Sequence, residues 1–144
     1  MSLTVADLKY LDSAQLYQWI KQNASSSGSK FLVVDVRDSD YVGGHIRGGL
    51  NVPSSTVKSQ LEPLFNRLLE NDVKDVVFHC ALSQQRAPSS AMLFIRYLNQ
   101  QNSDLTKGLK IWILKGGFVK WQEAYGEDDS VTEAYEKDIW RYGY

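Results

Sequence analysis

The segment DVVFHCALSQQRAP, residues 75–88, decides the fold of this chain. Its first five residues form a short apolar run rich in β-branched side chains, which is typical of a buried strand. Pro88 stands where a proline can occupy an early position of a helix. We therefore predict a strand over 75–79, then a seven-residue segment from Cys80 to Arg86, and then a helix.

The alternation of strand and helix continues on both sides of this segment. Apolar runs predict further strands at residues 31–36, 46–52 and 110–114. Helical spacing of apolar residues predicts helices over 12–23, over 54–71, where Pro63 could split the helix, and through Phe118, Trp121 and Tyr125. Such an alternation predicts an α/β fold with a mostly parallel sheet and helices on both faces. Ligands of these sheets bind at the carboxyl ends of the strands, where Cys80 lies.

The length and charge of the chain limit its organisation and its partners. With 144 residues we expect a single domain over 1–144, with a core at about 10–126 and a C-terminal arm over 127–144. Sixteen Lys and Arg residues against seventeen Asp and Glu give a net charge of -1, so we expect no nucleic-acid partner. No apolar run or leader sequence suggests a membrane span or secretion.

The cysteine and histidine content argues against disulfides and metal sites. Cys80 is the only cysteine, so no disulfide can form within the chain. The two histidines, His45 and His79, do not have the spacing of zinc ligands, and we expect no metal. These features favour a reducing compartment, and we expect a cytoplasmic protein, with the nucleus as an alternative.

The segment from Cys80 to Arg86 has the residues of an anion site. Unpaired N–H groups of a loop and of the following helical turn give a concavity a partial positive charge. A cysteine at such a place commonly has its pKa lowered from about 8.5 into the range of roughly 3.5–7.5, so we expect Cys80 to be a nucleophile at neutral pH. Arg86 would hold two oxygens of a tetrahedral oxyanion, and Ser83 would donate to the departing thiolate or orient the loop.

Cys80 and His79 each have a purely structural interpretation as well as a functional one. A lone cysteine at a strand end is often a small buried apolar residue, and that alternative stays open for Cys80. His79 is expected to hydrogen-bond the loop as a structural residue, because a thiolate in such a loop needs no general base.

Three ordered blocks of the sequence resemble one family. The block at 79–88, His-Cys-x5-Arg-x-Pro, resembles the active loop of the M-phase inducer phosphatases, which have the rhodanese fold, and fungal arsenate reductases of that fold look like it too. Residues 34–37 with 41–51, and residues 114–118, agree with the resemblance, which spans about residues 31–121. It implies a three-layer rhodanese-like fold.

The resemblance also implies roles for individual residues. Cys80 would take the phosphoryl group as a thiophosphate, and Arg86 would bind its oxygens. The phosphate would be cradled by the backbone amides of Ala81, Leu82, Ser83, Gln84, Gln85 and Arg86. Asp35, Arg37, His45 and Arg47 would form a buried charge and turn network, with Asp35 and His79 in supporting roles. Gly43, Gly44, Gly48 and Gly49 would supply turns.

The resemblance is incomplete where the general acid is concerned. The phosphatases usually carry Glu after the cysteine, and this chain has Ala81. A proton for the leaving group would then come from the phosphate monoanion, from solvent, or from a carboxylate such as Asp38 or Asp40.

Four functions remain open from the sequence. The first is a cysteine-dependent phosphatase acting on phosphotyrosine or other phosphoesters, with a phosphorylated protein or a small phosphoester as its partner and no cofactor. The second is an arsenate reductase, which would need an external thiol such as glutathione because there is no second cysteine. Sulfurtransfer fits the fold but suits a shorter loop, and a non-catalytic phosphate-binding module is the fourth alternative.

Overall fold

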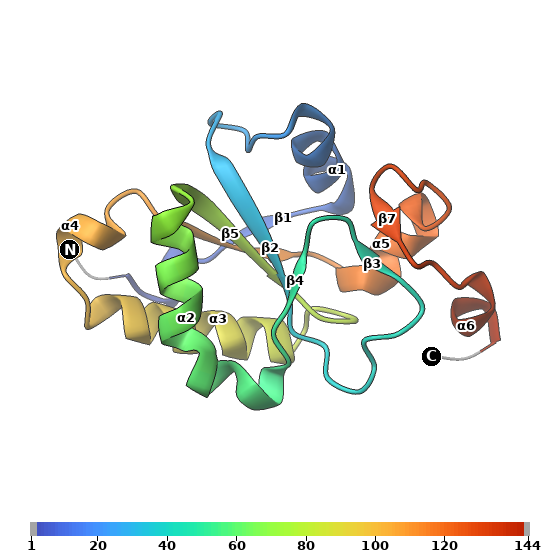
Figure 1. The fold of residues 1–144 in the computed structure, drawn as a ribbon. Coiled ribbons are helices and arrows are strands. Elements are labelled where there is room, and N and C mark those ends of the chain that lie inside the picture. The colour runs from blue at the N-terminus through green and yellow to red at the C-terminus, as the bar shows by residue number, and fades with distance from the viewer. Residues whose placement is uncertain (1–2, 143–144) are drawn as a thin grey trace.

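The computed structural model describes residues 3–142, and a parallel sheet lies at its centre (Figure 1). Five strands lie in the order β1-β6-β5-β2-β4, and every neighbouring pair is parallel. Their bounds are β1 Lys9–Leu11, β6 Lys110–Leu114, β5 Val73–His79, β2 Lys30–Asp35 and β4 Leu50–Asn51. A second, small antiparallel sheet pairs β3 (His45–Ile46) with β7 (Thr132–Glu133).

Helices cover both faces of the sheet, which confirms the predicted α/β three-layer arrangement (Figure 1). On one face lie α2 (Val57–Glu70) and α3 (Arg86–Asn99), which bury side chains such as Phe65 and Phe94. On the other face lie α1 (Ser13–Gln22) and α5 (Gly117–Tyr125), which bury Trp19 and Trp121. The short helical segments are η1 Val5–Asp7, η2 Ser54–Thr56, α4 Ser103–Thr106 and α6 Lys137–Tyr142.

Most of the predicted elements are confirmed with small shifts at their ends. Helix α1 begins after Asp12, whose carboxylate accepts the N–H of Gln15 at 2.8 Å, and it ends at Asn23 in the left-handed conformation. Pro88 is the third residue of α3, within the first turn, where its missing N–H has no intrahelical partner to lose. Both features are local, which is why the sequence pattern finds them.

Two predictions about the elements need correction, and one strand was missed. The single strand expected at 46–52 is wrong, because Gly48 at φ +79 turns the chain and leaves the two short strands β3 and β4. Pro63 does not split α2, because it lies on the exposed side of the helix, where the carbonyl of Ser59 can bond to water. Strand β1 was missed because it is three residues long and buries only Leu11.

The C-terminal segment docks on the rest of the chain. Trp140 of α6 donates from Nε1 to the carbonyl of Gly43 at 2.8 Å, and its ring lies 5.4 Å from that of Phe118. Tyr144, which we assigned to this arm, lies outside the described residues. Across residues 3–142, every helix is too short or too polar to cross a bilayer.

Candidate functional site

The seven-residue segment forms a loop at the carboxyl edge of the sheet. Strand β5 ends at His79, and α3 begins at Arg86, so the loop leaves a central strand and leads directly into a helix. A pocket of about 290 Å³ opens over the loop. It is lined by Cys80, Ala81, Leu82, Gln84, Gln85 and Arg86. The fold therefore brings six of the seven loop residues to one pocket.

Ser83, the seventh, is not among the lining residues and fixes the curl of the loop. Its N–H donates to Cys80 Sγ at 3.2 Å, and its hydroxyl accepts the N–H of Cys80 at 3.4 Å. Ser83 is buried and has a φ of +59°, a left-handed conformation that bends the chain sharply. Of its two expected roles, orientation of the loop is the one that this geometry displays.

The N-terminus of α5 holds the first two carbonyls of the loop. Phe118 N–H donates to the Cys80 carbonyl and Val119 N–H donates to the Ala81 carbonyl, both at 3.0 Å. Because a trans peptide unit points its N–H opposite to its C=O, the amides of Ala81 and Leu82 point away from α5. The contact joins segments that lie far apart in the sequence.

Gly117 makes this contact sterically feasible. Its φ is +59°, and a Cβ at this position would lie 2.6 Å from the Cys80 carbonyl oxygen. The sequence signal was the pair Gly116-Gly117 after a strand, which we had noted only as part of the family resemblance. Its packing against the loop required the tertiary structure.

Arg86 does not stand alone at the mouth of the pocket. Its guanidinium forms a two-pronged pair with Asp40, with both N–O distances at 2.7 Å, and contacts Asp38 Oδ2 at 3.3 Å. Ser54 Oγ and the Ser55 N–H donate to the Asp38 carboxylate at 2.6 and 2.9 Å. The loop after β2 thus supplies two carboxylates that pair with Arg86, the arginine expected to bind phosphate.

These contacts favour the charged form of every group. Hydrogen bonds from Arg86 lower the pKa of Asp40, and they outweigh its partial burial. Burial would raise the pKa of Asp38, but the donors Ser54, Ser55 and Arg86 lower it to about 2. The pairing with Asp40 raises the pKa of Arg86 above its usual value. Asp38 and Asp40 are therefore ionised at neutral pH, and neither is protonated to act as the general acid we had considered.

A buried group of side chains supports the loop from below. Arg37 is fully buried, and its Nη2 contacts the Asp35 carboxylate at 2.7 Å and also donates to the Gly44 carbonyl, while its Nη1 donates to the Val42 carbonyl. Burial would raise the pKa of Asp35, but neighbouring His79 and the Arg37 guanidinium hold it below its usual value. Of the four residues expected in a buried charge network, Asp35 and Arg37 form a buried pair.

His79 links this group to the loop. Its Nδ1 lies 3.1 Å from the Cys80 carbonyl oxygen, an acceptor, so this nitrogen carries the ring proton. Burial lowers the pKa of His79, which favours the neutral ring. The hydrogen bond to the loop agrees with the structural role that the sequence suggested.

Two members of the expected buried network are not buried. His45 is partly exposed and faces Glu133 of β7 at 3.2 Å, and Arg47 is exposed and donates to the Asp129 carbonyl. Both come from the segment around β3, which pairs with β7 at the rim of the fold rather than with the central sheet. Within the described part of the chain, no group of three or more His, Cys, Asp or Glu side chains could hold a metal ion.

Comparisons with known proteins agree with this architecture. The CDC25-like phosphatase YCH1 of Saccharomyces cerevisiae is 42% identical over 97% of this chain and 99% of its own length. The crystal structure of Saccharomyces cerevisiae Ygr203w, described as a homolog of single-domain rhodanese and Cdc25 phosphatase catalytic domain, has a TM-score of 0.89 at 40% identity. The match covers 99% of this chain and 98% of that one.

A second kind of relative is named an arsenate reductase. Arsenate reductase 2.2 of Oryza sativa is 30% identical over 80% of this chain and 82% of its own length. The model of the rhodanese-like domain matches residues 14–124, which run from α1 to the end of α5 and include the whole loop. The chain belongs to the rhodanese-like domain family, alongside relatives that are named phosphatases and arsenate reductases.

Proposed function

We propose that this chain is a cysteine-dependent phosphatase that hydrolyses phosphotyrosine or other phosphoesters through a thiophosphate on Cys80. The observation that carries the proposal is the pocket over the loop, where Cys80 and Arg86 meet and the Cys80 sulfur accepts the N–H of Ser83. The Arg86 guanidinium can bind two oxygens of a tetrahedral anion at once. The pairing of a sulfur nucleophile with such a donor suits phosphoryl transfer.

The loop amides supply the second part of the cradle in this proposal. The amides of Ala81 and Leu82 point away from α5, and both residues line the pocket. N–H groups fixed in this way stabilise negative charge on the equatorial oxygens without reorganising during the reaction. The hydrogen bonds from Phe118 and Val119 would therefore act on catalysis by positioning the loop.

The reaction has two steps that share one site. The Cys80 thiolate attacks phosphorus, an S–P bond forms, the ester P–O bond breaks, and the leaving oxygen takes a proton from solvent or from the phosphate monoanion. Water then attacks the phosphorus, the S–P bond breaks, and inorganic phosphate and the thiolate are released. Since Asp38 and Asp40 are ionised, esters with good leaving groups should react fastest.

The test is hydrolysis of p-nitrophenyl phosphate by the wild type and three variants. Cys80→Ser should abolish turnover, and Arg86→Ala should lower kcat/KM by about a hundredfold or more. Arg96→Ala, an exposed arginine near the other end of α3, is the matched control and should leave activity unchanged. Equal rates for the wild type and Cys80→Ser would reject the proposal. Phosphate binding without hydrolysis of any ester would instead favour a binding module.

Arsenate reduction is the second candidate, and the rice relative named arsenate reductase 2.2 favours it. Arsenate resembles phosphate in charge and shape, so the same pocket could hold it. Cys80 would bond to arsenic with loss of water. Two external thiols such as glutathione would then supply two electrons and become a disulfide, and the S–As bond would break to release arsenite and the Cys80 thiolate. Formation of arsenite with glutathione and glutaredoxin tests this candidate, and its absence at millimolar arsenate would count against it.

A further inference from the structure

The outer edge of β2 carries an unused set of backbone groups. Strand β2 pairs with β4 only through Val34 and Asp35. Residues 30–33 have β5 on one side and, within the described part of the chain, no strand on the other. An open strand edge of this kind can accept another extended chain.

The direction of the backbone groups follows from the hydrogen bonds at the end of the strand. Val36 N–H donates to the His79 carbonyl, toward β5, whereas the Asp35 carbonyl accepts the N–H of Val52, on the β4 side. Successive residues of a strand point their N–H and C=O groups to opposite sides. Phe31 and Val33, four and two residues before Asp35, therefore direct theirs to the β4 side. The pairing of Val34 with Leu50 uses the Val33 carbonyl, so the N–H and C=O of Phe31 and the N–H of Val33 are the groups that face the open edge.

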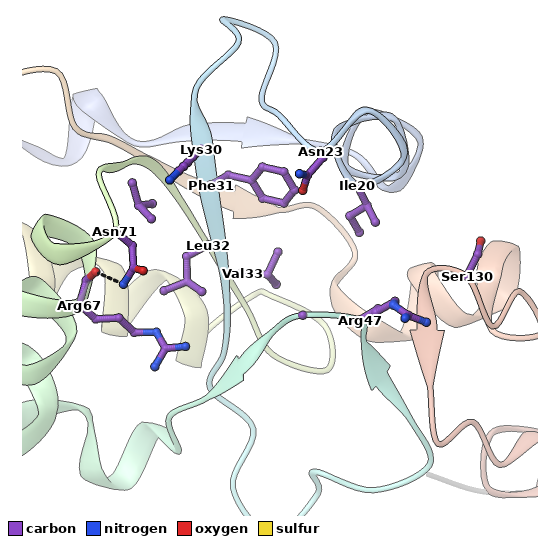
Figure 2. A pocket seen from close by; sticks show the side chains of 12 residues that line it. Ile20, Asn23, Lys30, Phe31, Leu32, Val33, Arg47, Arg67, Asn71 and Ser130 are labelled. Atoms are coloured by element: carbon purple, nitrogen blue, oxygen red, sulfur yellow. Dashed lines mark hydrogen bonds between the residues drawn. The ribbon is translucent and has the colours of Figure 1, made fainter.

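This edge forms the floor of a cavity of about 560 Å³ (Figure 2). Ile20 and Asn23 at the end of α1 form one wall, and Arg67 and Asn71 at the end of α2 form the other. Figure 2 shows the side chains of β2 alternating between the two walls, so that the strand backbone lies between them. The cavity shares no lining residue with the pocket over the Cys80 loop.

The rim of the cavity is positively charged. Lys30, Arg47 and Arg67 line it, they come from three different elements, and no Asp or Glu does so among the described residues. None of the three forms an ion pair with another residue in the range 3–142. Arg47 donates to a backbone carbonyl, that of Asp129, which anchors its position without neutralising its charge.

We propose that the open edge of β2 docks an extended acidic segment of a partner protein as an added strand. The N–H and C=O of Phe31 and the N–H of Val33 would pair with the main chain of that segment, and carboxylates along it would meet Lys30, Arg47 and Arg67. The match of charge selects an acidic partner, and the unpaired main-chain groups select a peptide over a nucleic acid, which has no peptide backbone to pair. This proposal goes beyond the proposed function and does not depend on it.

The first experiment uses the peptide acetyl-Glu-Thr-Glu-Val-Glu-Thr-amide with the full chain. A titration followed by NMR should shift the amide resonances of Phe31 and Val33. The affinity should be at least about tenfold higher than that of the same peptide with Lys in place of each Glu. Two further forms of the acidic peptide carry N-methyl groups on one or the other set of alternate residues. Their affinities should differ, because only one of the two sets of amides faces the edge. Equal binding of both N-methylated forms and the parent would overturn strand addition.

The second experiment tests the charges with exposed residues whose replacement does not disturb the core. The double variant Arg47→Glu with Arg67→Glu should weaken peptide binding by about tenfold or more. Lys58→Glu with Lys107→Glu changes the net charge equally outside the cavity, and affinity should stay within about twofold. Equal losses of affinity in both double variants would overturn the proposed site. The proposal would also be overturned if the acidic peptide did not bind at millimolar concentration, which is the result expected if the charges only prevent the edge from pairing with other strands. Binding of oligouridylate in place of the peptide would overturn the choice of partner.

Discussion

Two arginines of this chain each bind aspartate, and their surroundings give them opposite properties. Arg37 is fully buried against Asp35, and its guanidinium lies 4.4 Å from the centre of the Phe118 ring. Arg86 pairs with Asp40 and Asp38 at the mouth of the pocket, where about a third of its side chain is exposed. Both are pairs of arginine with aspartate, but water reaches Arg86 and does not reach Arg37.

That difference separates a structural pair from one that can exchange its partner. An arginine sealed inside the fold cannot find a replacement for a lost carboxylate, because no water or ligand reaches it. An arginine at a pocket mouth can exchange one anion for another at little cost, because solvent compensates both states. We infer that Arg37 holds the segment after β2 in place and that Arg86 can release Asp40 to bind a phosphoryl group.

The largest expected effect is on the buried pair. Arg37→Met should lower the free energy of unfolding by about 3–5 kcal/mol, because Asp35 is left charged and buried without its main partner. Urea denaturation measures the loss. Arg86→Met is the matched control and should cost about 1 kcal/mol or less. If the two variants lose the same stability, the distinction between the two pairs is wrong.

The next effect is on activity at the exposed pair. Arg86→Lys keeps the charge but loses the planar fork, so kcat/KM for p-nitrophenyl phosphate should fall by about 100-fold to 1,000-fold with little change in stability. Steady-state kinetics and a urea unfolding curve on the same preparation separate the two quantities. A folded lysine variant with nearly wild-type activity would show that Arg86 does not bind the reacting group.

A smaller effect on stability should appear at the exposed pair when the pH is lowered. Asp38 has a pKa near 2 in the folded chain against 3.8 for the ordinary group, so its stabilising contacts are complete above about pH 4 and disappear as the pH falls toward 2. The wild type should therefore exceed Asp38→Asn in stability by about 1 kcal/mol or less at pH 6, and the difference should shrink by pH 3. A difference that is constant with pH would rule out the carboxylate charge as its cause.

The smallest effect concerns competition for Arg86. Asp40→Asn removes the charge that competes with phosphate, so KM for p-nitrophenyl phosphate and the inhibition constant for phosphate should both fall by about twofold to fourfold. Glu123→Gln, an exposed carboxylate of α5 outside the loop, is the control for the change in net charge. A rise of KM in Asp40→Asn would mean that Asp40 positions Arg86 rather than competing for it.

The sequence alone was sufficient for the layered fold and for the loop itself. Strand β5, the loop and α3 are consecutive, so the apolar run, Cys80, Arg86 and Pro88 specify them through local preferences. The Asp35 and Arg37 pair, which was expected from the family resemblance, is local too, since a single residue separates its members in the chain. Short elements such as β1 escaped notice, because three residues carry too little periodicity to stand out.

Only the tertiary structure decided what surrounds the loop. The contact of Gly117 with the Cys80 carbonyl and the pairing of Arg86 with Asp40 both join segments that lie tens of residues apart. The open edge of β2 likewise results from the order of the strands in the sheet. Their formation depends on how strands order themselves in the sheet and on which helix packs beside which strand end. A sequence pattern records the local preference of each segment, whereas these contacts arise from the packing of whole elements against one another.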